Sequence, residues 1–107
     1  MSIIDRLEAT LAEGTENVQL RFGLASAYFR EGQFEAARKH AAVAVELDPE
    51  YSAAWRLFGR SLIELDEKVA AQTALEKGIA AAQQRGDMQL VKEMTVFLKR
   101  LQREEQG

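Results

Sequence analysis

The chain has 107 residues, of which 47% are hydrophobic and 29% are charged, and its net charge is −3. A chain of this size can build one hydrophobic core, and its charge provides no basic surface of the kind that nucleic-acid binding requires. The sequence contains no cysteine, which excludes disulfides and thiolate chemistry, and no apolar run approaches the roughly 18 residues of a membrane-spanning helix.

The first predicted element is a helix over residues 2–13, ended by Gly14. Its apolar residues recur at helical spacing and form one face: Ile3, Ile4, Leu7 and Leu11. The chain starts without the charged residues and long apolar run that make a signal peptide. We therefore expect a cytoplasmic protein.

Residues 18–51 predict two helices joined by a turn at Gly32, because glycine readily takes the left-handed conformation that ends a helix. The apolar positions of the first helix are Leu20, Leu24, Ala27 and Tyr28, and those of the second are Ala37, Ala41, Ala44 and Val45. Asp48 followed by Pro49 predicts the N-cap and first position of the next helix.

Residues 52–85 repeat this pattern, with Ser52 aligned on Val18 and Arg85 on Tyr51. Large residues mostly align with large ones and small with small: Leu24 with Phe58, Ala25 with Gly59, Tyr28 with Leu62, Ala37 with Ala71, and Val45 with Ile79. A fixed period that spans a whole pair of helices indicates stacked units, each of which buries its apolar face against its neighbours.

Residues 87–105 predict a final helix, with Gly86 ending the preceding helix and Asp87 capping this one. Its apolar face carries Leu90, Val91, Met94, Phe97, Leu98 and Leu101, and its polar side carries Lys92, Lys99, Arg100 and Arg103. Arrays of repeats expose an apolar face at each end, so we expect this helix and the helix over 2–13 to act as caps.

The repeated motif resembles the tetratricopeptide repeat, a helix-turn-helix unit of about 34 residues. The second copy reads Trp55-x-x-Phe58-Gly59-x-x-Leu62 and then Ala71-x-x-x-Leu75, and the first reads Leu24-Ala25-x-x-Tyr28 and closes on Leu47-Asp48-Pro49. The sequence departs from the family pattern at Arg21, which aligns with Trp55, at Asp66 in place of the turn glycine, and at Gln83 in place of the closing proline.

The resemblance implies an all-α fold, a right-handed α-solenoid of six helices within one domain over residues 1–107. Two helix-turn-helix repeats, over 18–51 and 52–85, are then flanked by an N-terminal and a C-terminal capping helix. The segment from Gly86-Asp87 through Lys92-Glu93-Met94 to Arg100-Leu101 is also similar to short stand-alone bacterial proteins of this family.

The resemblance further implies a concave surface lined by the first helix of each repeat. The residues expected to face it are Gln19, Phe22, Ser26, Phe29, Arg30, Ala53, Arg56, Arg60, Ile63 and Glu64. Aromatic residues beside arginines suit a peptide with an acidic group, because the planar guanidinium pairs bidentately with carboxylate. The alternative is that the capping helices cover Phe22 and Phe29 and fill the short groove.

Other candidate sites favour structural roles. The neighbours of His40 supply neither a catalytic partner nor metal ligands, so we interpret it as a surface or groove-edge residue. We expect Trp55 to belong to the core. Family members that bind chaperone C-terminal carboxylates use a clamp of lysine, asparagine and arginine, whereas the matching positions here hold Phe22, Ser26, Leu57, Asp87 and Val91. We expect no catalysis, cofactor or metal.

Two functional hypotheses follow. The first is a protein–protein interaction module that binds a protein or peptide in the concave groove, with no nucleic acid or membrane as partner. The second is a self-assembling structural or scaffold subunit, a homo-oligomer or a docking piece of a larger complex, in which Met88 and Phe97 are candidate contact residues.

Overall fold

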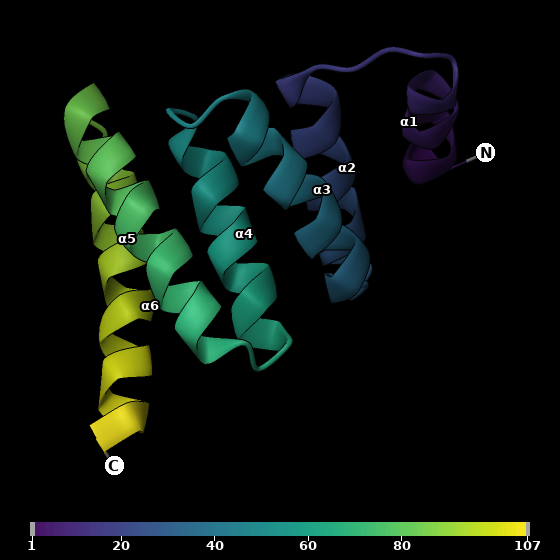
Figure 1. Ribbon diagram of the computed structural model, residues 1–107. Helices are drawn as coiled ribbons and strands as arrows, with labels where there is room; N and C mark the ends of the chain where they lie inside the picture. The colour runs from purple at the N-terminus through teal and green to yellow at the C-terminus, as the bar shows by residue number, and fades with distance from the viewer. Residues whose placement is uncertain (1, 107) are drawn as a thin grey trace.

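The computed structural model describes residues 2–106, which fold into six α-helices and contain no strand (Figure 1). In chain order the helices are α1 (Ile3–Ala12), α2 (Val18–Arg30), α3 (Phe34–Leu47), α4 (Ser52–Glu64), α5 (Lys68–Arg85) and α6 (Met88–Gln106). The hairpins α2–α3 and α4–α5 are flanked by α1 and α6. The predicted all-α fold with two repeats and two end helices is confirmed.

The helices of the array form two layers. α2, α4 and α6 lie in one layer, where α4 contacts both of the others, and α3 and α5 lie in the second layer. Each second-layer helix packs against two helices of the first layer, α3 against α2 and α4, and α5 against α4 and α6. Among the described residues, α3 and α5 have no Cα atoms within 8 Å of each other, so the second layer is open between them.

Small residues allow the two layers to approach closely. A β-carbon added at Gly78 of α5 would stand 2.7 Å from Cβ of Trp55 and 2.6 Å from Sδ of Met94. One added at Gly59 of α4 would stand 2.8 Å from Cδ2 of Leu75. Since real β-carbons do not come this near to other atoms, the glycines set the distance at which α5 packs against α4 and α6.

The two hairpin turns share one backbone conformation although their sequences differ. Gly32 has a φ of 75°, and Asp66, which holds the equivalent position of the second repeat, has a φ of 60°. In each turn the next backbone N–H, of Gln33 or Glu67, donates a 2.9 Å hydrogen bond to a carbonyl of the preceding helix. Glycine adopts this left-handed region freely, whereas for a residue with a β-carbon it costs about 1 kcal/mol. Asp66 therefore carries local strain that Gly32 does not.

The predicted start of α4 is wrong. The helix begins at Ser52, not at Pro49. Asp48 Oδ1 accepts a 3.0 Å hydrogen bond from the backbone N–H of Glu50, which closes a local turn instead of capping a helix. The carbonyl of Pro49 accepts a 2.7 Å hydrogen bond from Nε1 of Trp55, so the loop is tied to the helix that follows it.

The N-terminal helix is the least buried element. Ser2 and Asp5 form a capping box at its start, and none of its residues is fully buried. α1 contacts α2 alone, and Leu7 lies 3.6 Å from where a β-carbon of Gly23 would stand. The side chains of α1 that pack against α2 are half-buried and lie on one face of the helix. α1 therefore caps one side of α2.

The C-terminal helix begins as predicted. Gly86 ends α5 with a φ of 73°, and Asp87 Oδ1 accepts a 3.2 Å hydrogen bond from the backbone N–H of Leu90. On its outer side, Lys92 occupies the position that Leu24 and Phe58 hold in the two repeats. The lysine is exposed whereas those residues pack inward, so α6 ends the array with a polar face.

Candidate interaction groove

The predicted groove residues lie on α2 and α4, and none of them is fully buried. Gln19 and Arg30 are exposed; the half-buried ones are Phe22, Ser26, Phe29, Arg56, Arg60 and Ile63. A third helix, α6, lies beside α4 in the same layer and contributes further side chains. Three helices thus build this surface, one more than the two helices that carry the residues predicted from the sequence.

A row of apolar side chains occupies one equivalent position on each helix of this layer: Phe29, Ile63 and Phe97. Arg60 lies across the row, with its Cζ 4.8 Å from the ring centroid of Phe29 and 5.4 Å from that of Phe97. Arg100 also lies near Phe97, with its Cζ 6.0 Å from the ring centroid. Cation–π contacts of this kind hold a guanidinium in place while its N–H edges stay available to another group.

Phe97 was absent from the predicted groove and was assigned to self-assembly. The signal that could have found it was the period itself, since Phe97 lies two periods after Phe29. The groove residues predicted from the sequence were taken from the two repeats alone, and none was placed in the capping helix over 87–105.

Arg56 and Arg60 have different partners. Arg56 Nη1 donates a 2.6 Å hydrogen bond to Oε2 of Glu93 on α6, and the two groups form a partly exposed ion pair. This hydrogen bond is the main reason that the pKa of Glu93 is lowered. Glu93, which sequence reasoning missed, neutralises part of the groove's positive charge, whereas Arg60 forms no ion pair within residues 2–106.

The two predicted aromatic residues lie at different ends of the groove. Phe22 packs against Tyr51, with ring centroids 5.1 Å apart and planes tilted by 33°. Phe29 packs edge-on against Phe34, also with centroids 5.1 Å apart. One end of the predicted groove therefore carries the first aromatic pair. The other end carries the second aromatic pair together with Arg60 and Phe97.

The interpretation of His40 as a surface or groove-edge residue is wrong. Its exposed fraction is 3%, and its ring stacks on that of Tyr28 with centroids 5.6 Å apart. Arg21 Nη1 lies 2.9 Å from Nδ1 of His40, and Arg21 also pairs with Glu16 at 2.8 Å. Arg21 belongs to another helix and precedes His40 by 19 residues, so no local sequence pattern could indicate the contact.

The expectation that Trp55 belongs to the core is confirmed, since its exposed fraction is 9%. Within residues 2–106 no group of three or more His, Cys, Asp or Glu side chains is arranged to hold a metal ion. Across the same residues, no helix combines the length and apolar character that a membrane span requires.

Comparison with protein families gives a match to a model described as the tetratricopeptide repeat, over residues 29–94. A TPR repeat-containing protein of Pseudomonas aeruginosa is 45% identical over 101 residues, which are 94% of this chain and 96% of that protein. A heat-shock protein cognate co-chaperone of Aspergillus fumigatus is 40% identical over 57 residues, which are 53% of this chain but 17% of that protein.

Among solved structures, the fold is similar to the solution structure of a protein from Bordetella parapertussis. The TM-score is 0.83 and the sequence identity is 48%, and the match covers 98% of this chain and 91% of that one. The likeness therefore extends over all six helices and includes both end helices.

Proposed function

Because the chain belongs to the tetratricopeptide repeat family, whose repeats generally mediate protein–protein interaction, we propose that it binds a segment of a partner protein on the surface formed by α2, α4 and α6. The segment would carry an acidic side chain close to an apolar one.

The observation that carries the proposal is the position of Arg60 between Phe29 and Phe97. The two rings fix the guanidinium and shield it partly from water, so a carboxylate that pairs with it loses less to competing solvent. The planar group can offer two N–H donors to one carboxylate. No carboxylate of residues 2–106 takes that place.

The charge around Arg60 supports an acidic ligand, although the whole chain is negative. The residues assigned to this surface and its border include four arginines, Arg30, Arg56, Arg60 and Arg100, against two glutamates, Glu64 and Glu93. The row of Phe29, Ile63 and Phe97 adds a half-buried apolar strip that a leucine or aromatic residue of the partner can cover.

The co-chaperone relative does not extend this proposal to a chaperone tail. Its match spans 17% of that protein's length. The five positions where a carboxylate clamp would lie hold Phe22, Ser26, Leu57, Asp87 and Val91, which cannot supply its lysine, asparagine and arginine.

The test is a selection from a random peptide library displayed on phage, with the immobilised full chain as bait. We expect the selected peptides to share an acidic residue near an apolar one and to lose binding at least about tenfold to the variants Arg60→Glu and Arg60→Gln. Arg6→Glu, which reverses an exposed charge on α1, is the matched control and should retain binding.

Circular dichroism of each variant would verify that helicity is unchanged. Peptides without acidic residues, or peptides that bind Arg60→Glu as tightly as the unaltered chain, would contradict the proposed function.

A further inference from the structure

Two adjoining cavities lie on the opposite side of the molecule from the groove, between α3 and α5. Their volumes are about 560 Å³ and about 410 Å³, and both are lined by Val45, Glu46, Trp55 and Lys77. Since they share these residues, they form one continuous depression, which we name the α3/α5 furrow. Its lining residues come from α3, α4 and α5, and Figure 1 shows α4 between α3 and α5.

The furrow stays open because the side chains on its walls are short. Ala74 and Ala81 line it on α5 and Ala42 lines it on α3, while Trp55 of α4 forms its floor. Lys77 reaches across, with Nζ 5.6 Å from the centroid of the Trp55 ring. The result is an apolar channel that runs along two helices and is wide enough to receive side chains of another helix.

The helix on one side of the furrow carries few charged residues. From Val69 to Gln84, α5 carries only two charged residues, Glu76 and Lys77. Val69 is 76% exposed, and Ala70 and Ala80 are exposed as well. Exposed apolar side chains on a helix with few charges offer a surface that suits a contact with another chain.

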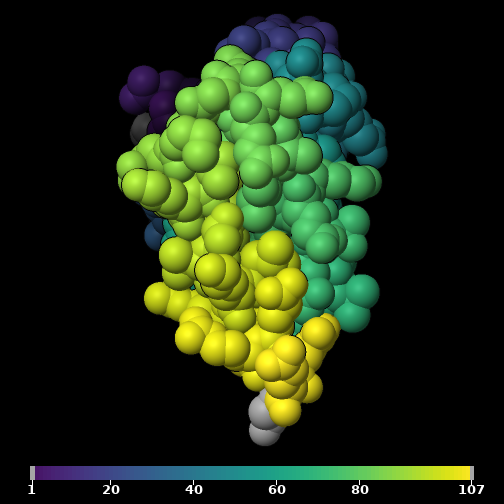
Figure 2. Space-filling model, turned by 90° about the vertical axis from the view of Figure 1, so that its left-hand side faces the viewer, coloured from purple at the N-terminus to yellow at the C-terminus, as the bar shows by residue number. Residues whose placement is uncertain are grey.

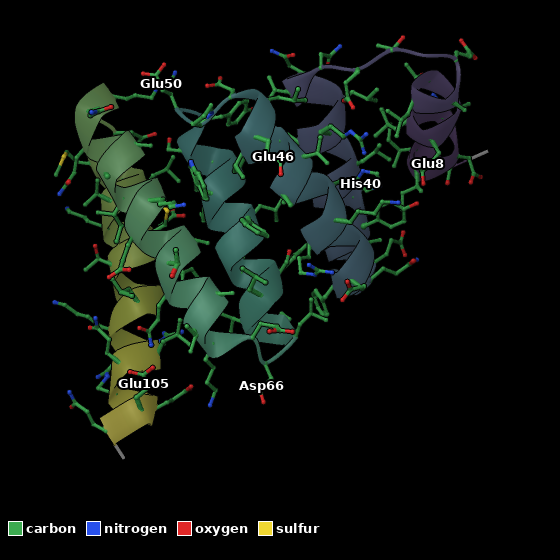
Figure 3. The ribbon with its side chains drawn as sticks, viewed as in Figure 1. Glu8, His40, Glu46, Glu50, Asp66 and Glu105 are labelled. Carbon is green, nitrogen blue, oxygen red and sulfur yellow. The ribbon has the colours of Figure 1, made fainter. Side chains whose placement is uncertain are left out.

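The other side of the furrow is acidic. Glu46 on α3 and Glu50 in the loop before α4 line it, and both are exposed (Figure 3). Two cations lie nearby: Lys77 on the opposite wall lies over the Trp55 ring, and Arg85 Nη1 donates a 3.2 Å hydrogen bond to the backbone carbonyl of Glu50. Within residues 2–106 neither forms an ion pair with the Glu46 or Glu50 carboxylate. The furrow thus combines an apolar floor with a negative edge along α3.

A surface of complementary character exists on the same chain. The outer face of α6 carries Met88, Lys92, Val96, Lys99 and Arg103 at helical spacing, a set that we name the α6 stripe. Met88 is 55% exposed and Val96 is 47% exposed. The stripe contains no acidic residue, and within residues 2–106 none of its three basic side chains forms an ion pair.

The α6 stripe is open to a partner. Figure 2 shows α5 and α6 side by side at this end of the array, with no further element over them. Glu104 and Glu105 contact Lys68 and Gln72 of α5, and so leave the basic side of α6 unopposed. With 19 residues, α6 is about 28 Å long, and the 18-residue α5 beside the furrow is about 27 Å long.

We propose that the chain self-associates, with the α6 stripe of one copy seated in the α3/α5 furrow of a second copy. Met88 and Val96, at the two edges of the stripe, cover apolar side chains of the furrow, and Lys92, Lys99 and Arg103, which lie between them on the helix, reach Glu46 and Glu50. The contact joins two different surfaces, and leaves the groove of α2, α4 and α6 free. It is independent of the proposed function.

The test measures the mass of the full chain by sedimentation over a wide concentration range, at low and at high salt. We expect the mean mass to rise with concentration and the rise to weaken in high salt, because the paired charges are partly exposed. The variant Lys92→Glu/Lys99→Glu and the variant Glu46→Lys/Glu50→Lys should each lose association at least about tenfold. An equimolar mixture of the two variants should regain it, because the reversed stripe fits the reversed furrow.

The matched control is Arg6→Glu/Arg30→Glu, which changes the net charge by as much as Lys92→Glu/Lys99→Glu but lies on α1 and α2, outside both surfaces, and should associate like the unaltered chain. Arg60→Glu should do so too, which separates this proposal from peptide binding in the groove. Trp55 is the chain's only tryptophan and lies under the furrow, so its emission should shift as the mass rises.

Three outcomes would overturn the proposal. The unaltered chain could sediment as a monomer at every concentration and salt. The mixture of reversed variants could fail to regain association. Association could also occur without any change in Trp55 emission, which would place the contact elsewhere.

Discussion

Arg21 of α2 donates a hydrogen bond from Nη1 to Nδ1 of His40 on α3, at 2.9 Å. An arginine is always a donor, so Nδ1 must be the acceptor and the buried imidazole must be neutral. Burial, with smaller contributions from Arg21 and Lys39, lowers the pKa of His40, while Glu8 and Glu16 act in the opposite sense. Glu8 and His40 lie at the α1 end of the array (Figure 3).

This pair predicts a stability that depends on pH. The pKa of His40 is lower in the folded chain than its ordinary value of 6.5, so the unfolded chain binds the proton more tightly. The free energy of unfolding should hold its full value above about pH 6.5 and fall as the pH decreases toward the lowered folded pKa. Urea unfolding between about pH 8 and pH 5 would measure it.

His40→Gln is the control for this prediction, because it removes the titrating group. Glu16 and Glu93 have lowered pKa values, and the stability that they contribute to the fold is lost only at more acidic pH. An unfolding free energy that falls equally in His40→Gln and in the unaltered chain above pH 5.5 or so would show that another group is responsible.

A second prediction concerns the attachment of α1. Tyr28 Oη donates a 2.6 Å hydrogen bond to Oε2 of Glu8, and this bond is the main reason that the pKa of Tyr28 is raised to about 12. Tyr28→Phe should weaken the docking of α1 by about 1 kcal/mol and speed amide hydrogen exchange in α1 more than elsewhere. Tyr51→Phe, whose hydroxyl forms no hydrogen bond within residues 2–106, should leave α1 unchanged.

A third prediction uses the two equivalent turns. Asp66→Gly should raise the free energy of unfolding by about 0.5 kcal/mol, because relief of the positive φ outweighs the greater freedom of glycine in the unfolded chain. The reverse change at the matching position, Gly32→Asp, should lower it by a similar amount. Urea unfolding would measure both changes. If the two substitutions changed the free energy of unfolding in the same direction, the explanation by backbone strain would be refuted.

A fourth prediction compares two helical glycines. Gly78→Ala should destabilise the fold by about 1–3 kcal/mol, because the new methyl would meet Cβ of Trp55, which cannot move without its helix. Gly23→Ala has its nearest neighbour at 3.6 Å and should stabilise α2 by up to about 1 kcal/mol through helix propensity. Thermal unfolding would measure both, and a neutral Gly78→Ala would mean that the packing adapts.

A fifth prediction concerns the groove and depends on the proposed function. Glu93→Gln should free Arg56 and tighten the binding of acidic peptides by roughly two- to fivefold, since the lost ion pair is partly exposed. Glu13→Gln, on the exposed end of α1, is the control and should leave affinity unchanged. Fluorescence anisotropy with a labelled peptide would measure both, and weaker binding by Glu93→Gln would argue that Glu93 itself holds the ligand.

Much of the fold followed from the period of the repeat. The alignment of Ala25 with Gly59 and of Leu24 with Phe58 located the close approaches and the core, because stacked units must repeat their buried positions. The period also identified Asp66 as the counterpart of Gly32. The start of α4 was wrong because Asp48 and Pro49 carry the same signal for a helix start and for a local turn, and only the bonds to Glu50 and Trp55 separate the two.

The sequence by itself determined the helices, their repetition and the face that each turns inward, since these depend on residues a few positions apart. Only the tertiary structure decided which side chains meet across helices. It buried His40 against Arg21, brought Phe97 to Arg60 and Glu93 to Arg56, and left α3 and α5 apart. Such contacts depend on the distance between helices, which the packing of the whole core sets and no local pattern encodes.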